Sequence, residues 1–231
     1  MIKENLEDIQ NKISSAAKRA ERDAGEITLI AVSKTYPVEA IKEAITQGNR
    51  DFGENKVKEL MDKIPEIEKE VRWHLIGHLQ TNKVKYIVGQ VELIHSVDSI
   101  KLVDEIQKQS VKKGVISNIL IEVNIAKEDS KHGVYLEEMQ DFLNHIATLS
   151  HVRVKGLMTV APYVVDPEEN REVFKGLYNL SVDIQKQNID NISTDILSMG
   201  MSNDFEVAIE EGATMVRVGT AIFGKREYAK K

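Results

Sequence analysis

Short apolar runs alternate with segments of helical periodicity along this chain, and this alternation restricts the possible folds most strongly. The first run, 27–33, is short, β-branched and mostly apolar, which is typical of a strand buried on both faces. The segment before it, 2–23, repeats apolar residues at helical spacing among charged ones, and Gly25 ends it. Strands that alternate with helices predict a parallel sheet covered by helices.

The same alternation continues until eight strands are complete. We expect strands at 27–33, 50–53, 72–77, 93–96, 116–123, 154–160, 196–199 and 215–218. We expect helices at 2–23, 38–46, 56–63, 82–88, 100–113, 136–149, 170–187, 204–211 and 221–228. Eight strands within 231 residues favour a closed (β/α)8 TIM barrel with an extra N-terminal helix. The strongest rivals are an open Rossmann-like sheet and a miscounted second strand.

No linker divides the chain. The sequence has no Pro/Gly/Ser-rich or low-complexity stretch, so we expect one domain over residues 1–231. Its N-terminus lacks the continuous apolar core of a secretory signal, and its longest apolar runs have the length of a strand. The absence of cysteine excludes disulfides, thiolate nucleophiles and cysteine-based zinc sites. These features predict a cytoplasmic protein that has no membrane-spanning part.

Both signs of charge are spread along the chain. The formal net charge is −6, and no basic stripe of the kind that binds a nucleic-acid backbone is present. The nearest feature is the C-terminal tail, with Lys225, Arg226, Lys230 and Lys231. We interpret this tail as a solvated end, with a weak nucleic-acid or partner contact as the alternative. No apolar stripe stands out beyond the faces that the barrel needs, so we expect a monomer.

Polar residues and glycines gather directly after the predicted strands, where barrels of this type carry their sites. Lys34 follows the first strand. A lysine that closes a buried strand is desolvated, which lowers its pKa and raises the fraction of free amine that can attack a carbonyl carbon. The alternative is a lysine whose ammonium group reaches water from the rim of the barrel.

Two glycine-containing segments, 198–204 and 219–220, follow the seventh and eighth strands, and each opens into a helix. Amide groups at helix N-termini suit a phosphate, and the loops after these two strands are the usual phosphate site of the barrel. Ser202 and Thr220 add hydroxyl donors beside Gly219. The alternative is ordinary helix capping by Ser202 or Asn203 and a tight turn at Gly219. Because both segments follow neighbouring strands, we favour the phosphate interpretation.

Arg217 lies inside the eighth strand, where its charge needs a partner. That partner is either a carboxylate or the ring nitrogen of a cofactor. A reactive amine, a phosphate site and a partner for a ring nitrogen are the three groups that pyridoxal 5'-phosphate (PLP) needs. His74 and His78 are four residues apart like metal ligands on a helix, but they lie along a strand, so we expect no metal site. We expect His78 near the pocket and His74 lower in the barrel.

Several long motifs resemble the YggS/PROSC family of PLP homeostasis proteins, from the first strand to the eighth. The matching segments are 31–35 (AVSKT), 52–55 (FGEN), 73–83 (WHLIGHLQTNK), 156–158 (GLM), 197–204 (LSMGMSND) and 217–224 (RVGTAIFG). The resemblance implies a fold like the barrel domain of alanine racemase, the fold type III of PLP proteins.

The resemblance also assigns the site. It implies PLP held covalently by Lys34 as a Schiff base, with the phosphate on Ser202, Gly219 and Thr220. Arg217 would face the pyridine nitrogen. The pocket would further be lined by Asn55, His78 and Met199.

An arginine opposite the pyridine nitrogen is always charged, so it leaves the nitrogen largely unprotonated and PLP a weak electron sink. Only about a dozen residues follow the eighth strand, which leaves no chain for the second domain of the racemases. A second acid or base is not obvious at the rim, since we interpret Tyr163 and Tyr228 as partly buried aromatic residues.

We therefore expect a protein that holds PLP in vitamin B6 and amino-acid homeostasis without catalytic turnover, and that delivers it to PLP-dependent enzymes. A small PLP-dependent amino-acid racemase is the alternative. A Schiff-base aldolase that uses Lys34 on a phosphorylated sugar is a third, weaker hypothesis.

Overall fold

The computed structural model describes residues 1–67, 70–128 and 132–224. Its strands are β1 Thr28–Val32, β2 Asp51–Glu54, β3 Arg72–Leu75, β4 Leu93–Val97, β5 Ser117–Glu122, β6 Val152–Met158, β7 Ile192–Met201 and β8 Met215–Val218. Its α-helices are α1 Ile2–Arg19, α2 Val38–Thr46, α3 Val57–Lys63, α4 Val84–Ile87, α5 Ile100–Lys113, α6 Met139–Ala147, α7 Arg171–Lys186, α8 Phe205–Glu210 and α9 Thr220–Phe223. Short 3-10 turns are η1 Ala24–Glu26, η2 Ile64–Glu66, η3 Thr81–Lys83, η4 Leu136–Glu138 and η5 Pro167–Asn170.

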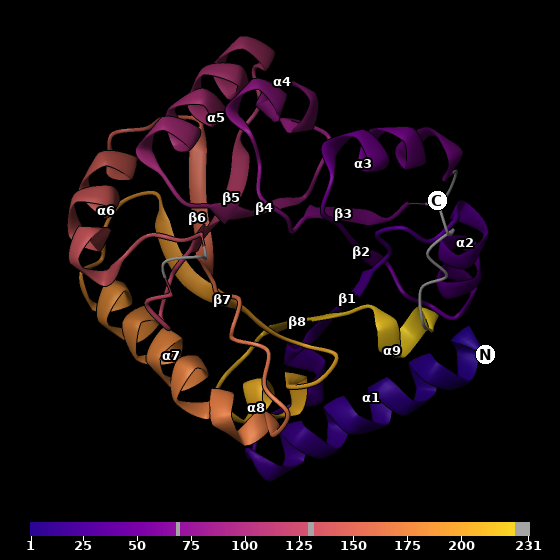
Figure 1. Cartoon of the computed structure of the whole chain (residues 1–231). Helices are drawn as coiled ribbons and strands as arrows, with labels where there is room; N and C mark the ends of the chain where they lie inside the picture. The colour runs from indigo at the N-terminus through magenta and orange to yellow at the C-terminus, as the bar shows by residue number, and fades with distance from the viewer. Residues whose placement is uncertain (68–69, 129–131, 225–231) are drawn as a thin grey trace.

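The strands β1 to β8 are parallel and form a closed barrel in chain order. β1 and β8 close it, with Ile30 opposite Arg217 and Ala31 opposite Val218. Figure 1 looks along the barrel and shows the strands at the centre and the helices around them. The predicted TIM barrel with an extra N-terminal helix is confirmed, and the open sheet and the miscounted second strand are excluded.

α1 lies outside the ring of helices, along α8 and α9 (Figure 1). Its apolar face is buried, with Ile2, Leu6, Ile9, Ile13, Ala16 and Ala17. The helix ends at Arg19 rather than at residue 23, because Glu21 adopts the left-handed backbone conformation, with φ 54°, that a right-handed helix cannot continue.

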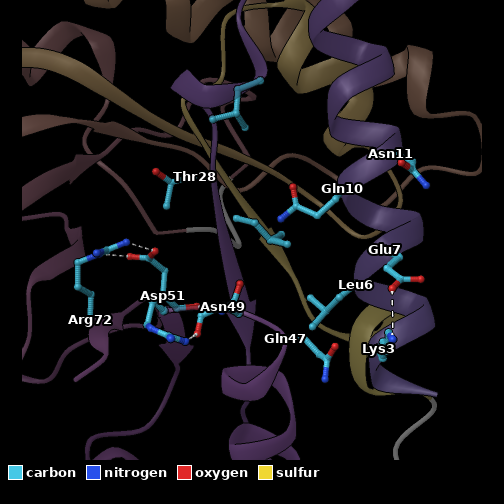
Figure 2. A pocket seen from close by; sticks show the side chains of 14 residues that line it. Lys3, Leu6, Glu7, Gln10, Asn11, Thr28, Gln47, Asn49, Asp51 and Arg72 are labelled. Carbon is cyan, nitrogen blue, oxygen red and sulfur yellow. Dashed lines mark hydrogen bonds and ion pairs between the residues drawn. The ribbon is translucent and has the colours of Figure 1, made fainter. Parts of the chain in front are cut away.

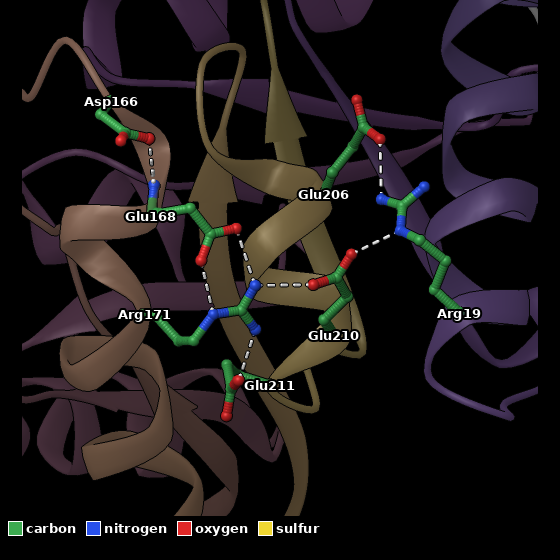
Figure 3. A network of polar contacts seen from close by, with 7 residues as sticks. All are labelled: Arg19, Asp166, Glu168, Arg171, Glu206, Glu210 and Glu211. Atoms are coloured by element: carbon green, nitrogen blue, oxygen red, sulfur yellow. Dashed lines mark hydrogen bonds and ion pairs between the residues drawn. The ribbon is translucent and has the colours of Figure 1, made fainter.

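Arginines join the outer helices through shared carboxylates (Figure 3). Arg19 of α1 donates to Glu206 and Glu210 of α8. Arg171, the first residue of α7, donates to the other oxygen of Glu210. A single exposed ion pair contributes little to stability, but a carboxylate shared between two arginines connects three helices at one point.

Apolar side chains fill both sides of the barrel wall. The larger cluster contains the buried residues of the helices and of the strand faces that meet them. A smaller cluster contains Leu93, Leu120 and Met158, packed with Val160, Ile196 and Met215. Because alternate residues of a strand point to the same side, Ile196 and Met215 lie on the same strand faces as Ser198 and Arg217. This smaller cluster therefore lies inside the barrel.

A column of polar side chains runs through the barrel interior beside the smaller cluster. Asp51 Oδ1 lies 3.1 Å from His74 Nε2, and His74 Nδ1 lies 3.0 Å from His95 Nε2. His95 Nδ1 lies 3.0 Å from Ser198 Oγ, which accepts a hydrogen bond from Arg217 at 2.6 Å. All five residues are buried. Asp51 begins β2 and Arg217 lies near the end of β8, so this polar column connects the two ends of the barrel.

Several predicted bounds agree with the structure, among them the helices at 38–46 and 100–113 and the strand at 215–218. The largest differences concern short or irregular elements. β7 begins at Ile192 rather than at 196, and the helix expected at 82–88 is a 3-10 turn followed by the short α4. The last helix of the described chain is α9, and residues 225–231, with the basic tail, lie outside the described residues. Within the described chain, no helix combines the length and the apolar character needed to cross a membrane.

Glu122 places a carboxyl group inside the barrel, at the end of β5, on the same strand face as Leu120 of the smaller cluster. It is buried. Burial, reinforced by the nearby charge of Asp98, raises the pKa of Glu122 to about 7, although the charge of Arg217 opposes this shift. The folded protein therefore binds a proton at Glu122 in a pH range where the unfolded chain has released it.

The pH dependence of stability tests this assignment. The stability that arises from protonated Glu122 is fully present below the unfolded pKa and is lost as the pH rises through about 7. The wild type should lose up to about 3 kcal/mol of unfolding free energy across this range relative to Glu122→Gln. Urea denaturation of the wild type and the variant at a series of pH values measures the difference. Glu26→Gln, at an exposed carboxylate, is the matched control and should keep the slope of the wild type. Parallel curves for wild type and Glu122→Gln would contradict the raised pKa.

Candidate functional site

A cavity of about 350 Å³ opens at the carboxyl end of the barrel strands. Six of the eight predicted site residues line this cavity: Lys34, Asn55, Ser202, Arg217, Gly219 and Thr220. Its other lining residues are Val32, Ile76, Val160, Pro162, Tyr163, Val164, Met201, Asn203 and Asp204. These residues follow or end strands that are far apart in the sequence, and closure of the sheet between β1 and β8 brings them together.

Lys34 lies just beyond the end of β1 and is half-buried. The backbone on either side of it is fixed, because Ser33 N donates to Gly53 O at 3.1 Å and Thr35 N donates to Glu59 Oε1. Thr35 has φ 70°, a left-handed conformation that costs on the order of 1 kcal/mol for a β-branched residue. The surrounding contacts therefore hold Thr35 in a backbone conformation that β-branched residues rarely adopt.

A buried ionic cluster lies against the Lys34 loop. Lys63 Nζ donates to Ser33 O at 2.8 Å and to Glu54 Oε1 and Glu59 Oε1, both at 2.7 Å. The hydroxyl of Ser33 also donates to Glu54 Oε1, at 2.7 Å. Burial raises the pKa of Glu54, while its hydrogen bonds to Lys63 and Ser33 act in the opposite direction. Because a buried ammonium group needs these partners, Lys63 connects α3 to the loop that carries Lys34.

The ionic cluster around Lys63 was not predicted from the sequence. One feature of the sequence could have indicated the cluster: Glu59 and Lys63 are four residues apart on the helix expected at 56–63. This spacing brings opposite charges together on a helix. Nothing in the sequence indicated that Lys63 would be buried, since lysine is among the residues found least often in protein interiors.

Asn55 lines the cavity and carries a buried polar atom that no described group satisfies. It follows β2, and its Oδ1 atom is buried without a hydrogen-bond partner. The close approach of Gly77 contributes to this position, because a Cβ atom on Gly77 would lie 2.6 Å from Asn55 O. A buried acceptor without a partner costs about 1–3 kcal/mol, so Oδ1 is suited to accept a hydrogen bond from a bound molecule.

Ser202, Gly219 and Thr220 lie together at the ends of β7 and β8. Gly219 N donates to Ser202 Oγ at 3.3 Å. A Cβ atom on Gly219 would lie 3.2 Å from Val32 O, so glycine lets the chain pass close to the end of β1. The Gly219 amide and the hydroxyl groups of Ser202 and Thr220 thus lie on one wall of the cavity, where the sequence predicts a phosphate site.

Arg217 is buried and lines the floor of the cavity. It donates to Ser198 O at 2.7 Å and to Thr159 O at 2.8 Å, in addition to the Ser198 hydroxyl. Burial lowers the pKa of Arg217 to about 10, so the guanidinium stays charged at neutral pH. Among the described residues its direct partners are backbone carbonyls and one hydroxyl, so the ion pair with a carboxylate, expected as one alternative, is not found.

Two predicted site residues do not line the cavity. Met199 is buried in the larger apolar cluster, because its neighbour Ser198 faces the barrel interior and successive residues of a strand face opposite sides. His78 is largely exposed and lies beside Asp98 and His132. His74 lies lower in the barrel, as expected, within the polar column.

Tyr163 lines the cavity and is 91 % exposed, so the expectation of a partly buried aromatic residue is wrong for it. It lies in the loop after β6. Tyr228 lies outside the described residues. Asp204, which also lines the cavity, accepts hydrogen bonds from Met201 N at 2.7 Å and from Asn170 at 2.8 Å, so it shapes the turn after β7.

A larger hollow, of about 790 Å³, lies at the opposite end of the barrel between α1 and the first residues of β1, β2 and β3 (Figure 2). Arg72 donates to Asp51 at its wall, at 2.7 Å. The side chains that α1 contributes are mostly exposed polar groups. In these barrels the site lies at the carboxyl end of the strands, and the opposite end serves stability. We therefore place the functional site in the smaller cavity, around Lys34.

The sequence profile of the alanine racemase N-terminal domain matches residues 5–227 of this chain. A pyridoxal phosphate homeostasis protein of Aquifex aeolicus is 44% identical over 226 residues, which cover 97% of this chain and 98% of the relative. A protein of the same name from Escherichia coli is 41% identical over 238 residues, which cover 100% of this chain and 99% of the relative.

Solved structures are similar over the same extent. PipY of Synechococcus elongatus, solved with PLP bound, is 34% identical with a TM-score of 0.83, over 97% of this chain and 100% of PipY. An alanine racemase of Clostridium difficile is 13% identical with a TM-score of 0.73, over 98% of this chain and 57% of the racemase, a likeness that shows the fold alone. The chain therefore belongs to the family of the alanine racemase N-terminal domain and, within it, to the pyridoxal phosphate homeostasis proteins, the YggS/PROSC group that its motifs resemble.

Proposed function

We propose that this protein binds PLP in the cavity at the carboxyl end of the barrel, with Lys34 as its covalent anchor, and serves PLP homeostasis. The observation that carries the proposal is the convergence of Lys34, Arg217 and the hydroxyl and amide donors around Ser202 on one cavity of about 350 Å³. The PLP bound to PipY and the names of the curated relatives support the same ligand.

The residues present fit PLP in charge and in position. A phosphate needs several donors, and Ser202, Gly219 and Thr220 supply them on one wall. The buried Asn55 Oδ1 atom lacks a partner among the described residues and can accept a hydrogen bond from a hydroxyl group of the ligand. Half-buried Lys34 brings its amine to the same space.

When bound, PLP supplies an aldehyde that bonds reversibly to an amine and a pyridine ring that can withdraw electrons. Arg217 governs the second property. Its guanidinium remains charged because its pKa, although lowered by burial, is about 10. It would donate a hydrogen bond to the ring nitrogen without giving up a proton, which leaves the ring a weak electron sink. This favours storage of PLP over carbanion chemistry.

Among the residues that the structure describes, none gives the cavity a well-placed second acid or base. Of the titratable groups that line it, Arg217 stays charged and Asp204 is engaged by Met201 N and Asn170. Tyr163 is 91 % exposed and is not held against the cavity by any hydrogen bond found in the described chain. We propose that the protein holds PLP without turnover and acts as a monomer that passes PLP to PLP-dependent enzymes.

Replacement of Lys34 tests the covalent anchor. Lys34→Ala should abolish the visible absorption band of the PLP-loaded protein, because no amine would remain in place to bond the aldehyde. Lys56→Ala is the matched control, since Lys56 is exposed on the neighbouring loop and does not line the cavity. Absorption spectra with and without borohydride reduction make the comparison. A wild-type protein that stays colourless with PLP, or an unchanged band in Lys34→Ala, would refute the proposal.

A separate prediction concerns the wall of the cavity that Ser202, Gly219 and Thr220 form. Ser202→Ala combined with Thr220→Ala should weaken PLP binding by about tenfold or more, because each lost hydrogen bond to a charged group is worth about 1.5–3 kcal/mol. Pyridoxal, which lacks the phosphate, should bind the variant and the wild type alike. Equilibrium dialysis with the two ligands separates the two effects. Equal PLP affinity in both proteins would remove the phosphate assignment.

Absence of turnover is tested by proton exchange. The PLP-loaded protein, incubated with a panel of amino acids in deuterated water, should show no α-proton exchange or racemisation above that of free PLP. An amino-acid racemase is the competing function, because Tyr163 could serve as its acid if the loop after β6 closed. Exchange that is rapid in the wild type and lost in both Lys34→Ala and Tyr163→Phe would establish that function instead.

A further inference from the structure

Three potential metal ligands meet beside the barrel mouth, outside the cavity described above. His78 follows β3, Asp98 follows β4 and His132 lies beyond β5, so the carboxyl ends of three successive strands contribute one residue each. None of the three lines the PLP cavity. The histidine side chains are 44% and 58% exposed, and Asp98 is 12% exposed, so the group is open to an ion from solution.

The spacing of these groups is that of ligands around an ion rather than of a hydrogen bond. His78 Nδ1 and His132 Nδ1 lie 3.5 Å and 3.6 Å from the same Asp98 oxygen. An N–H···O hydrogen bond spans about 2.7–3.2 Å. Two ligand atoms about 2.0–2.1 Å from a tetrahedral zinc ion are separated by roughly 3.4 Å, which follows from the bond length and the tetrahedral angle. One ligand atom from each residue lies within 4.8 Å of the others.

Another histidine of the same protein provides a comparison. His145 Nε2 lies 2.6 Å from Asp104 Oδ1, which is the direct contact expected of a histidine and a carboxylate on an exposed surface. His78 and His132 do not close onto Asp98 in this way. Their rings stack instead, with centroids 4.1 Å apart and an interplanar angle of 16°, which keeps both Nδ1 atoms on the side of Asp98.

We propose that His78, Asp98 and His132 bind a late first-row divalent metal ion of the zinc class. Two imidazole nitrogens and one carboxylate oxygen are a common ligand set for such ions, with water in the remaining position. Calcium and magnesium prefer sites built entirely from oxygen atoms, and this ligand set does not favour them.

Calorimetric titration of Zn²⁺ into tag-free protein in a chelator-free and phosphate-free buffer tests the proposal. The wild type should show one saturable site, and His132→Ala and Asp98→Asn should each weaken binding by at least about tenfold, since even groups that only support a ligand are worth that much. His145→Ala is the matched control, because it removes a histidine that also faces an aspartate. It should bind Zn²⁺ like the wild type. Circular dichroism verifies that the variants are folded.

Substitution with Co²⁺ gives a second readout that does not depend on affinity alone. Co²⁺ bound by nitrogen and oxygen ligands in a four-coordinate site should give visible absorption bands, and these should disappear in His132→Ala and persist in His145→Ala. Absence of saturable Zn²⁺ binding in the wild type would overturn the proposal. Binding that survives in both His132→Ala and Asp98→Asn would overturn it as well.

Discussion

The positive charge of Arg217, buried inside the barrel, is the constraint on which the site depends. A buried guanidinium without hydrogen-bond partners would be costly in free energy. Arg217 therefore donates hydrogen bonds to the carbonyl groups of Ser198 and Thr159 and to the Ser198 hydroxyl. That hydroxyl begins the polar column through His95 and His74. Burial holds the pKa of His95 well below its usual range, so this histidine is neutral.

One arrangement of protons satisfies the whole polar column. Arg217 donates to Ser198, the Ser198 hydroxyl donates to His95 Nδ1, and the chain of donors continues through His74 to the carboxylate of Asp51. The column then runs from a cation near the barrel mouth to an anion at the other end. Outside the barrel, Arg72 pairs with Asp51. Burial acts to raise the pKa of Asp51, but the hydrogen bonds from His74 and Arg72 outweigh this effect and the pKa is lowered. The guanidinium is thus fixed in place before any ligand arrives.

Lys34 is positioned by a second and separate set of charges. Lys63 and Glu59 bind the backbone on either side of Lys34, and Glu54 accepts a hydrogen bond from Lys63. The Lys34 side chain faces the cavity. Two independent supports, one for the amine and one for the guanidinium, give a site that is preorganised on rigid strand ends. The mouth of the cavity is formed in part by the exposed Tyr163 and the adjacent loop. An organised floor beneath an open mouth agrees with a protein that binds PLP.

The sequence by itself determined the order of strands and helices, because buried parallel strands and amphipathic helices leave different apolar periodicities. It also indicated Lys34, Ser202, Arg217 and Thr220, since polar residues at strand ends stand out against apolar strands. Only the tertiary structure decided that Met199 faces the helices, and that Lys63 lies buried beside Ser33. It also placed His78 beside His132. The reason is physical: the direction of a side chain depends on strand register, and contacts between distant segments exist only after the barrel has closed.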